Sequence, residues 1–354
     1  EERKLANNDY VSIEDLRQTP KGIPAVSFFT GAGGLDIGFD YAGFNNLASI
    51  EVNELFCETL RLNYPDHLVI GPPDFSGDVK DRETIAKVLK KTLGIKTPFE
   101  GVFHGGPPCQ PFSIASNQRF TKEDENFKRK GFEDKDKGNL LDDYVWFITQ
   151  FKPKVFIIEN VPGLNEIDNG KGLTKSLEQL TKIGYNISKP QVVNSADYGV
   201  PQKRLRLIVV GTRGKQKFLF PETSLFQTPC FDVFAKPIDD NVNHITREHT
   251  AQSILRYMEL DFGQRDQLGR VDRLNPFLPS KTVIAGGTKG GGRSHLHPYS
   301  PRTLSVRESA RLQTFPDDYV FVGPSARQFT QVGNAVPPLL AFKLAFQIYN
   351  QFYG

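Results

Sequence analysis

The stretch AVSFFTGAGG, residues 25–34, decides the fold of this chain. Its apolar first half, Ala25 to Phe29, is typical of a short buried strand, and the glycines after it interrupt the strand with a tight turn. An apolar segment with the character of a helix follows at once. A strand, a glycine turn and a helix in this order are typical of an α/β protein that binds its ligand at the carboxyl ends of its strands.

The same alternation of strands and helices continues in the C-terminal direction. Short apolar runs predict strands at residues 47–51, 101–104, 154–159 and 205–211. Helical periodicity predicts helices at 54–63, 82–92, 140–150 and in a closing segment that begins after Pro337 and Pro338. These elements predict a Rossmann-like α/β fold with a mixed, mostly parallel sheet and helices on both faces.

The composition changes between residues 221 and 304, where Pro, Gly, Asn and Thr are frequent and only short β-like pieces occur. We therefore predict a smaller, irregular, β-rich domain there, inserted into a larger one. The predicted organisation is an N-terminal extension at 1–23, a first part of the main domain at 24–220, the inserted domain at 221–304 and a return to the main domain at 305–354.

The bulk composition describes a folded protein rather than a disordered or membrane-spanning one. The 354 residues are 38% hydrophobic and 24% charged with a net charge of +3, and no apolar stretch approaches the roughly 20 residues that cross a bilayer. The first residues lack the apolar core of a signal peptide, so we expect a cytoplasmic protein. The three cysteines, Cys57, Cys109 and Cys230, are far apart, which predicts neither a disulfide framework nor a metal site.

The glycine turn is a candidate nucleotide site. Glu51 follows Gly31 by about 20 residues, at the end of the next predicted strand, where a carboxylate can accept hydrogen bonds from ribose hydroxyls. The dinucleotide fingerprint G-x-G-x-x-G fails at Asp36, so an adenosine-type ligand without a pyrophosphate fits better. A plain strand-to-helix turn is the alternative.

The stretch GPPCQP, residues 106–111, holds Cys109 in a stiff loop directly after a predicted strand. Prolines on both sides fix the backbone, which favours a thiol that is presented for reaction. The alternative is that Cys109 is a small core residue, as lone cysteines usually are.

Charged residues occur at two further strand ends. Glu159 ends the strand KVFIIE at the same sheet edge as Glu51 and Cys109, and burial there would raise its pKa so that it holds a proton. Arg204 and Arg206 alternate in QKRLR, residues 202–206, and so lie on one face of an extended chain, where they can bind a carbonyl or a phosphate. A turn-capping acid and solvated edge charges are the alternatives.

Together these motifs resemble the C5-specific DNA cytosine methyltransferase family, in its usual motif order over nearly the whole chain. The matching segments are FTGAGG at 29–34, Glu51, GDV at 77–79, GGPPCQPFS at 105–113, ENV at 159–161, QKRLR at 202–206, RESARLQTFP at 307–316 and QVGNAVP at 331–337. Departures are small: Ser27 and Phe28 replace the aspartate and leucine common before the glycine loop.

The resemblance implies an S-adenosylmethionine-dependent methyltransferase fold, with residues 221–304 as the target recognition domain. It implies methyl transfer from S-adenosyl-L-methionine, with S-adenosyl-L-homocysteine as product, to C5 of a flipped cytosine. Cys109 would attack C6, and Glu159 would protonate N3 or hydrogen-bond to it. Arg206 would hold the O2 carbonyl, and Arg204 would steady the loop or a phosphate.

The resemblance also implies two sets of binding residues and no metal ligands. The cofactor pocket would comprise Phe29, Gly31, Gly33, Gly34, Glu51, Val52, Asp78, Val79, Pro107, Leu140, Asn334 and Val336. The DNA contacts would comprise Ser113, Gln202, Lys281, Thr282 and Arg293.

The implied partner is double-stranded DNA carrying a specific short sequence. We expect a monomeric bacterial or phage-type modification enzyme, nucleoid-associated when on DNA and paired with a separate restriction endonuclease. Three other functions stay open: a tRNA cytosine-5 methyltransferase, a non-catalytic DNA-binding regulator on the same scaffold, and a nicotinamide-dependent oxidoreductase, which the failed glycine fingerprint disfavours.

Overall fold

An eight-stranded sheet forms the centre of the protein in a computed structural model that describes residues 12–108, 140–165, 170–238, 242–268, 271–285 and 295–354. The strands are β1 (Ile23–Phe28), β2 (Phe44–Ile50), β3 (Leu68–Ile70), β4 (Val102–Gly105), β5 (Val155–Asn160), β6 (Tyr185–Ile187), β7 (Gln191–Asn194) and β8 (Leu205–Arg213), with β9 (Asp272–Arg273) and β10 (His295–Leu296) in a separate pair. The helices are η1 (Ile13–Leu16), α2 (Gly34–Tyr41), α3 (Glu54–Asn63), α4 (Arg82–Lys91), α6 (Leu140–Phe151), η3 (Pro162–Asn165), α7 (Lys171–Lys182), η5 (Ser195–Tyr198), α8 (Phe231–Ala235), α9 (Ala251–Met258), α10 (Val306–Leu312), α11 (Ser325–Asn334) and α12 (Pro338–Phe352).

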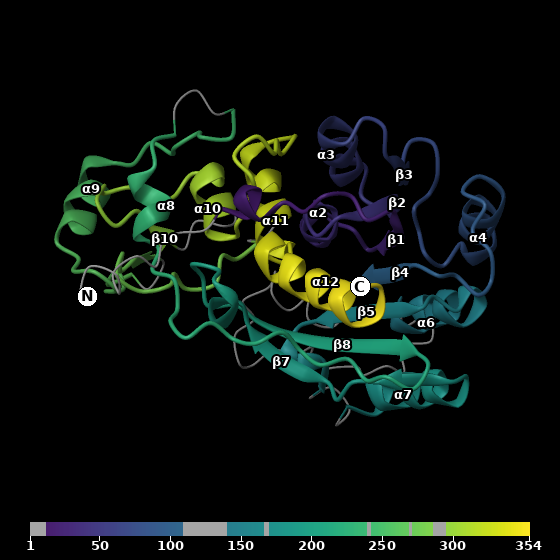
Figure 1. The fold of residues 1–354 in the computed structure, drawn as a ribbon. Coiled ribbons are helices and arrows are strands. Elements are labelled where there is room, and N and C mark those ends of the chain that lie inside the picture. The colour runs from purple at the N-terminus through teal and green to yellow at the C-terminus, as the bar shows by residue number, and fades with distance from the viewer. Residues whose placement is uncertain (1–11, 109–139, 166–169, 239–241, 269–270, 286–294) are drawn as a thin grey trace, which may run out of the picture.

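The order of the strands across the sheet decides which residues meet at its edge. The order is β3-β2-β1-β4-β5-β8-β6, with β7 also paired to β8 (Figure 1). Strands β1 to β5 pair in parallel, whereas β8 runs antiparallel to β5, with Asn160 opposite Leu207. The amino end of β8 therefore lies at the same edge as the carboxyl ends of β1, β2, β4 and β5.

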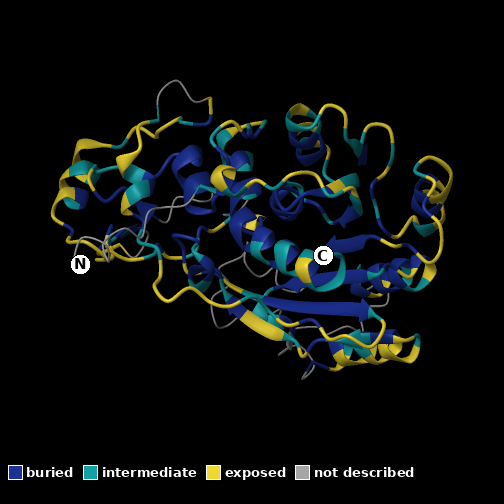
Figure 2. Ribbon diagram, in the orientation of Figure 1, coloured by how far each residue is buried: buried dark blue, intermediate teal, exposed yellow. Residues whose placement is uncertain are grey.

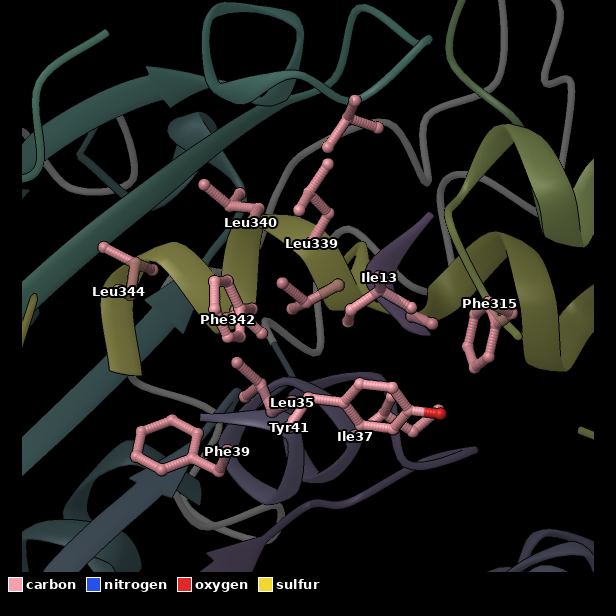
Figure 3. Packing of buried hydrophobic residues seen from close by; sticks show 14 of the residues in the cluster. Ile13, Leu35, Ile37, Phe39, Tyr41, Phe315, Leu339, Leu340, Phe342 and Leu344 are labelled. Atoms are coloured by element: carbon pink, nitrogen blue, oxygen red, sulfur yellow. The ribbon is translucent and has the colours of Figure 1, made fainter. Parts of the chain in front are cut away.

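Alternate residues of each strand serve two apolar layers, because successive side chains of a strand point to opposite faces. Val155 and Ile157 of β5 join one layer with α2 and α12, and Phe156 and Ile158 join the other with α4, α6 and α7. Figure 3 shows the first layer, where Phe342 of α12 points toward Leu35 of α2. In Figure 2 the central strands are buried along their length.

The described part of the predicted N-terminal extension, residues 12–22, packs against the main domain. Ile13 of η1 is 1% exposed and belongs to the layer formed by α2 and α12. Arg17 pairs with Asp40 at 2.9 Å, and the Gln18 N–H donates to the Tyr41 carbonyl at 2.7 Å. This segment is thus integrated with α2 rather than appended to it.

The predicted inserted region has its own small core and also shares the main one. Tyr257, Leu260, Val271 and Leu296 form a separate apolar cluster, while Val233, Leu274 and Val283 join the layer formed by α2 and α12. The short β-like pieces correspond to the two-residue strands β9 and β10, and two short helices, α8 and α9, were not predicted. None of the helices in the described residues is long and apolar enough to cross a membrane.

Helix α10 anchors this region through buried polar side chains. Arg311 is 5% exposed, and its guanidinium donates to the carbonyls of Lys236 at 2.7 Å and Pro237 at 2.9 Å. Arg307 is fully buried and donates to the Pro316 carbonyl at 2.7 Å and to Oδ1 of Asn243 at 3.2 Å. Since buried guanidinium groups must be paired, these arginines hold the region's loops to the main domain.

Candidate active site

The turn after β1 is held open by an acid at the end of the neighbouring strand. Phe29 and Gly31 both have positive φ, 54° and 59°, so the backbone turns sharply at the end of β1. Glu51 accepts hydrogen bonds from the N–H groups of Gly31 at 2.7 Å and Asn53 at 2.8 Å. No atom of the described residues lies within 4 Å of the place where a Cβ on Gly31 would point, so among them the turn offers open space beside its backbone.

Glu51 is a buried acid whose carboxyl group accepts hydrogen bonds from the backbone. It is 7% exposed, and burial raises the pKa of its carboxyl, which the N–H groups of Asn53 and Gly31 partly oppose. Val52, the next residue, is 59% exposed and presents an apolar side chain beside this acid. Gly77 packs against the Glu51 carbonyl and so brings Asp78, which is half-buried, and the buried Val79 to the same strand end.

The C-terminal segment packs against the turn after β1. A Cβ on Gly34 would lie 2.2 Å from the Val336 carbonyl oxygen, so glycine alone allows this approach. The Tyr319 hydroxyl donates to the Ala32 carbonyl at 2.8 Å, a second link to the turn. Asn334 is exposed and Leu140 is half-buried at the start of α6.

The loop after β4 passes directly beside Glu159. A Cβ on Gly106 would lie 2.5 Å from Oε2 of Glu159, and Nδ2 of Asn160 donates to the Pro107 carbonyl at 2.7 Å. Cys109 and Ser113 lie outside the described residues, but Pro107 precedes Cys109 by only two positions. The backbone that leads to the cysteine is therefore fixed against the end of β5.

Glu159 and Arg206 form an ion pair between β5 and β8. Arg206 Nε lies 2.8 Å from Glu159 Oε1, and the two side chains are 13% and 11% exposed. Arg206 Nη1 also donates to the Leu205 carbonyl at 2.7 Å, and no other hydrogen bond from Arg206 is found in the described part of the chain. Burial raises the pKa of Glu159, while Arg206 and Arg204 oppose that rise.

Gln202 and Arg204 do not reach solvent, which corrects the DNA contact expected of Gln202 and leaves Arg204 the first of its two expected roles, steadying a loop. Gln202 is 0% exposed and donates to Oε1 of Gln313 at 2.8 Å, so its side chain has no surface for the predicted DNA contact. Arg204 is 1% exposed and donates to the carbonyls of Val283 at 3.0 Å and Gly333 at 2.6 Å rather than to a phosphate. Both side chains point inward because residues 201–204 run beside residues 280–283.

The remaining predicted DNA contacts lie at the border of the inserted region. Lys281 is exposed, and its Nζ pairs with Oδ1 of Asp272 at 2.8 Å. Thr282 is half-buried, and its hydroxyl donates to the Lys203 carbonyl at 2.7 Å. Arg293 lies outside the described residues.

Asn160 and Gln313 are two polar residues that the sequence interpretation left without a role. Both lie inside recognised motifs, ENV and RESARLQTFP. Their partners, the Pro107 carbonyl and the Gln202 side chain, are 53 and 111 residues away in the chain. A motif alone therefore identified these residues without showing what they bind.

Comparisons with known proteins agree with this geometry. The family model for C-5 cytosine-specific DNA methylase matches residues 23–350. The type II methyltransferase M1.HphI of Haemophilus parahaemolyticus is 33% identical, over 90% of this chain and 85% of the relative. The type II methyltransferase M.BbvI of Brevibacillus brevis is 32% identical, over 88% of this chain and 86% of the relative.

A solved structure gives an independent comparison of the fold. The crystal structure of a prophage-encoded E. coli protein, described as a DNA modification methyltransferase, matches with a TM-score of 0.74 and 24% identity. The match covers 93% of this chain and 99% of that one. The predicted fold class is thereby confirmed.

Proposed function

This chain belongs to the C-5 cytosine-specific DNA methylase family and is a DNA (cytosine-5-)-methyltransferase, and we propose that it methylates a cytosine flipped out of a specific short sequence in double-stranded DNA. The observation that carries this proposal is that Glu159, paired with Arg206, lies against Gly106 while its neighbour Asn160 binds the Pro107 carbonyl, two positions before Cys109. An acid, a guanidinium and a thiol loop meet there at one strand edge.

The residues at the neighbouring strand ends fit S-adenosyl-L-methionine. The open space beside Gly31 admits a ligand against backbone N–H groups, and the Glu51 carboxylate keeps acceptor capacity beyond the two N–H groups that it binds. The exposed Val52 side chain offers an apolar surface for a purine, and Asp78, which follows Gly77 at the same strand end, would accept from its amino group. When bound, S-adenosyl-L-methionine supplies an electrophilic methyl group and leaves as S-adenosyl-L-homocysteine.

The cytosine ring must be activated before its C5 atom can bond to a methyl group. We propose that the Cys109 thiolate attacks C6 and forms an Sγ–C6 bond. The electron pair displaced from the C5–C6 double bond moves into the ring, where a proton given by Glu159 to N3 neutralises it. The raised pKa of Glu159 supports this role, because the acid must hold a proton near neutral pH.

Arg206 orients both the Glu159 carboxyl group and the cytosine ring. Its Nε holds Glu159 at 2.8 Å, and we propose that its other terminal nitrogen, Nη2, donates to the O2 carbonyl of cytosine. A guanidinium presents donors in a fixed plane, which suits one partner on each side. The carboxyl group is thereby directed to N3, the neighbour of C2.

The later steps return every group to its starting state. When N3 gives its proton back to Glu159, the electron pair is released to C5, which then bonds to the methyl group. Water removes the remaining C5 proton, the C5–C6 double bond forms again, and the Cys109 thiolate leaves. General acid-base catalysis of this kind contributes about 100 to 10,000-fold to a rate.

The base must leave the DNA stack to reach this edge, because C5 and C6 are covered in a duplex. Flipping costs a few kcal/mol, which contacts to phosphates and to neighbouring bases must offset. We propose that residues 221–304 read the target sequence, with Lys281, Thr282 and Arg293 as contacts and Ser113 beside the phosphate backbone. The exposure of Lys281 and its place at the border of the main domain support this role.

The type II relatives support a biological setting. We propose that the protein is the modification enzyme of a restriction–modification system, acting as a monomer on DNA in the bacterial cytoplasm, with a separate cognate endonuclease.

One experiment tests the activity and reveals its target. Unmethylated plasmid is incubated with methyl-labelled S-adenosyl-L-methionine and the wild-type protein or Cys109→Ser, and the DNA is then sequenced after bisulfite treatment. We expect cysteine-dependent protection at one short recurring sequence. Label transferred to tRNA and not to plasmid would replace the DNA substrate with RNA, and cofactor binding without transfer to either would favour the non-catalytic regulator.

A further inference from the structure

We propose that Gln202 and Arg204 are positioning residues that set how well the enzyme discriminates its target sequence, and that neither touches the substrate. The inference rests on the proposed function, since it assigns target reading to residues 221–304. It concerns the junction, defined here as residues 201–204 together with residues 280–283.

The Gln202 and Arg204 side chains hydrogen-bond to both backbone groups of one residue of the recognition region, Val283. The Val283 N–H donates to Gln202 Oε1 at 2.8 Å, and the Val283 carbonyl accepts from Arg204 Nη1 at 3.0 Å. Val283 itself is 1% exposed. Its backbone is therefore fixed in position and in rotation about the chain direction.

Backbone hydrogen bonds extend the grip along the junction. The Ser280 N–H donates to the Pro201 carbonyl at 3.0 Å, and the Lys203 N–H donates to the Ser280 carbonyl at 2.8 Å. The Thr282 hydroxyl donates to the Lys203 carbonyl at 2.7 Å. The two segments thus run side by side in parallel, and a displacement of one displaces the other.

The Gln202 and Arg204 side chains also bind residues of the C-terminal segment, Gln313 and Gly333. Arg204 Nη2 donates to the Gly333 carbonyl at 2.6 Å, and Gln202 Nε2 donates to Gln313 Oε1 at 2.8 Å. Gln313 in turn donates to the Val332 carbonyl at 2.7 Å. The recognition region is thereby tied to the end of α11, directly before Asn334 and Val336.

Arg206 follows Arg204 by two residues on the same chain, so the junction controls the catalytic pair as well. A shift of about 1 Å in a catalytic group can lower a rate about 100-fold. When residues 221–304 are bound to the correct target sequence, the junction therefore keeps Arg206 and Glu159 aligned with the base. When they are bound to a wrong sequence, the junction displaces this pair. Discrimination between target sequences would then depend on how rigidly the junction couples the position of residues 221–304 to the position of Arg206.

The test compares Gln202→Met and Arg204→Lys with the wild type. Each protein is assayed on a duplex with the target found by bisulfite sequencing and on a duplex with one substituted base pair, and S-adenosyl-L-homocysteine affinity is measured by calorimetry. We expect the ratio of the two kcat/KM values to fall about 10-fold, through a lower kcat/KM on the target duplex, while cofactor affinity stays within about 3-fold.

Two further variants separate positioning from other roles. Lys203→Gln is the matched control between the two residues, because its side chain is exposed and its backbone bonds remain. If it removes a contact to a phosphate, binding weakens evenly across sequences and the ratio does not change. The double variant Gln202→Met with Gln313→Met replaces both partners of a buried hydrogen bond by apolar groups, which limits the cost to folding. We expect it to bind the cofactor and still discriminate poorly.

Three outcomes would overturn the inference, and they differ in what they say about the proposed function. A lower kcat on both duplexes with an unchanged ratio would overturn the inference, since Arg204 would then act on the substrate or only support the fold. An active wild type with unaltered ratios in all variants would overturn the inference alone. A wild type that methylates no DNA would overturn the proposed function and, with it, the inference.

Discussion

Arg206 Nε lies 2.8 Å from Glu159 Oε1, across the antiparallel pair of β8 and β5. The pair is mostly buried, with side-chain exposures of 13% and 11%. Burial makes a lone charge costly, whereas an ion pair or a protonated acid is tolerated. The arrangement therefore lets Glu159 exchange a proton with a bound base while Arg206 keeps its orientation.

Replacing Glu159 tests this role through the pH dependence of the rate. We expect Glu159→Gln to lower kcat at least about 100-fold, because the amide cannot give N3 a proton. Since burial raises the pKa of Glu159 and the protonated acid is the active form, wild-type kcat should fall as pH rises through that pKa. A pH–rate profile should show this decline in the wild type and lose it in the variant.

The control for that profile is Glu178→Gln, an exposed glutamate of α7 far from the pair in the chain. Its profile should match the wild type. A Glu159→Gln enzyme that retained both the rate and the decline would show that another group supplies the proton.

Glu51 should govern cofactor affinity and the stability of the glycine turn together. Its carboxylate accepts from the N–H groups of Gly31 and Asn53, and Glu51→Ala leaves both donors without that partner. Because both donors are only partly buried, losing this partner costs at most about 1–3 kcal/mol, the cost of an unsatisfied buried donor. We expect a lower free energy of unfolding by that amount and at least about 10-fold weaker S-adenosyl-L-homocysteine binding, measured by urea unfolding and calorimetry, with the exposed Glu58→Gln as control.

Local signals predicted most of the central strands and several helices, but they missed β3, β6, β7, α7, α10 and α11. The predicted helices at 54–63 and 82–92 correspond to α3 and α4, because apolar periodicity is a property of neighbouring residues. The sequence could not reveal that β8 runs antiparallel to β5, although this direction brings Arg206 to Glu159.

The candidate site divides in the same way. Glu51 and Glu159 were found as acids at strand ends, and the structure brings each to the predicted edge. The burial of Gln202 and Arg204 depends on Val283 and Gly333, whose positions follow from packing far along the chain. A polar, basic segment such as QKRLR predicts a surface until those partners are known.

His104 should make the protein less stable in mild acid. Its ring is fully buried, stacks on Phe39 with centroids 4.2 Å apart, and has no hydrogen-bond partner among the described residues. Burial lowers its pKa from 6.5 to about 4, so between these values the unfolded chain binds a proton that the folded protein does not. Stability is therefore lost as pH falls through this window, by up to about 3 kcal/mol.

His104→Phe tests this account, because phenylalanine keeps the stacking and cannot bind a proton. Urea unfolding at pH 7.5 and pH 4.5 should show a smaller loss of stability in the variant than in the wild type. His297, whose pKa is also lowered to about 4 by burial, accounts for part of the remaining loss. Equal losses in the two proteins would assign the acid sensitivity to other groups.

Asn160→Asp tests the hydrogen bond that ties Pro107, at the start of the cysteine loop, to the end of β5. In the wild type, Nδ2 donates to the Pro107 carbonyl at 2.7 Å, and Oδ1 accepts from the Val161 N–H at 2.8 Å. Aspartate keeps the accepted bond, but it places an oxygen against the Pro107 carbonyl, and two acceptors repel each other.

We expect the loop to shift and the single-turnover rate of methyl transfer to fall by about 100-fold, because the thiol depends on this loop for its alignment with C6. Cofactor affinity should stay within about 3-fold, since Glu51 and the glycine turn are untouched. Asn160→Ala removes the donor without adding a repelling charge and should lose less activity than Asn160→Asp. Equal rates in Asn160→Asp and the wild type would mean that the loop is positioned by contacts of its own.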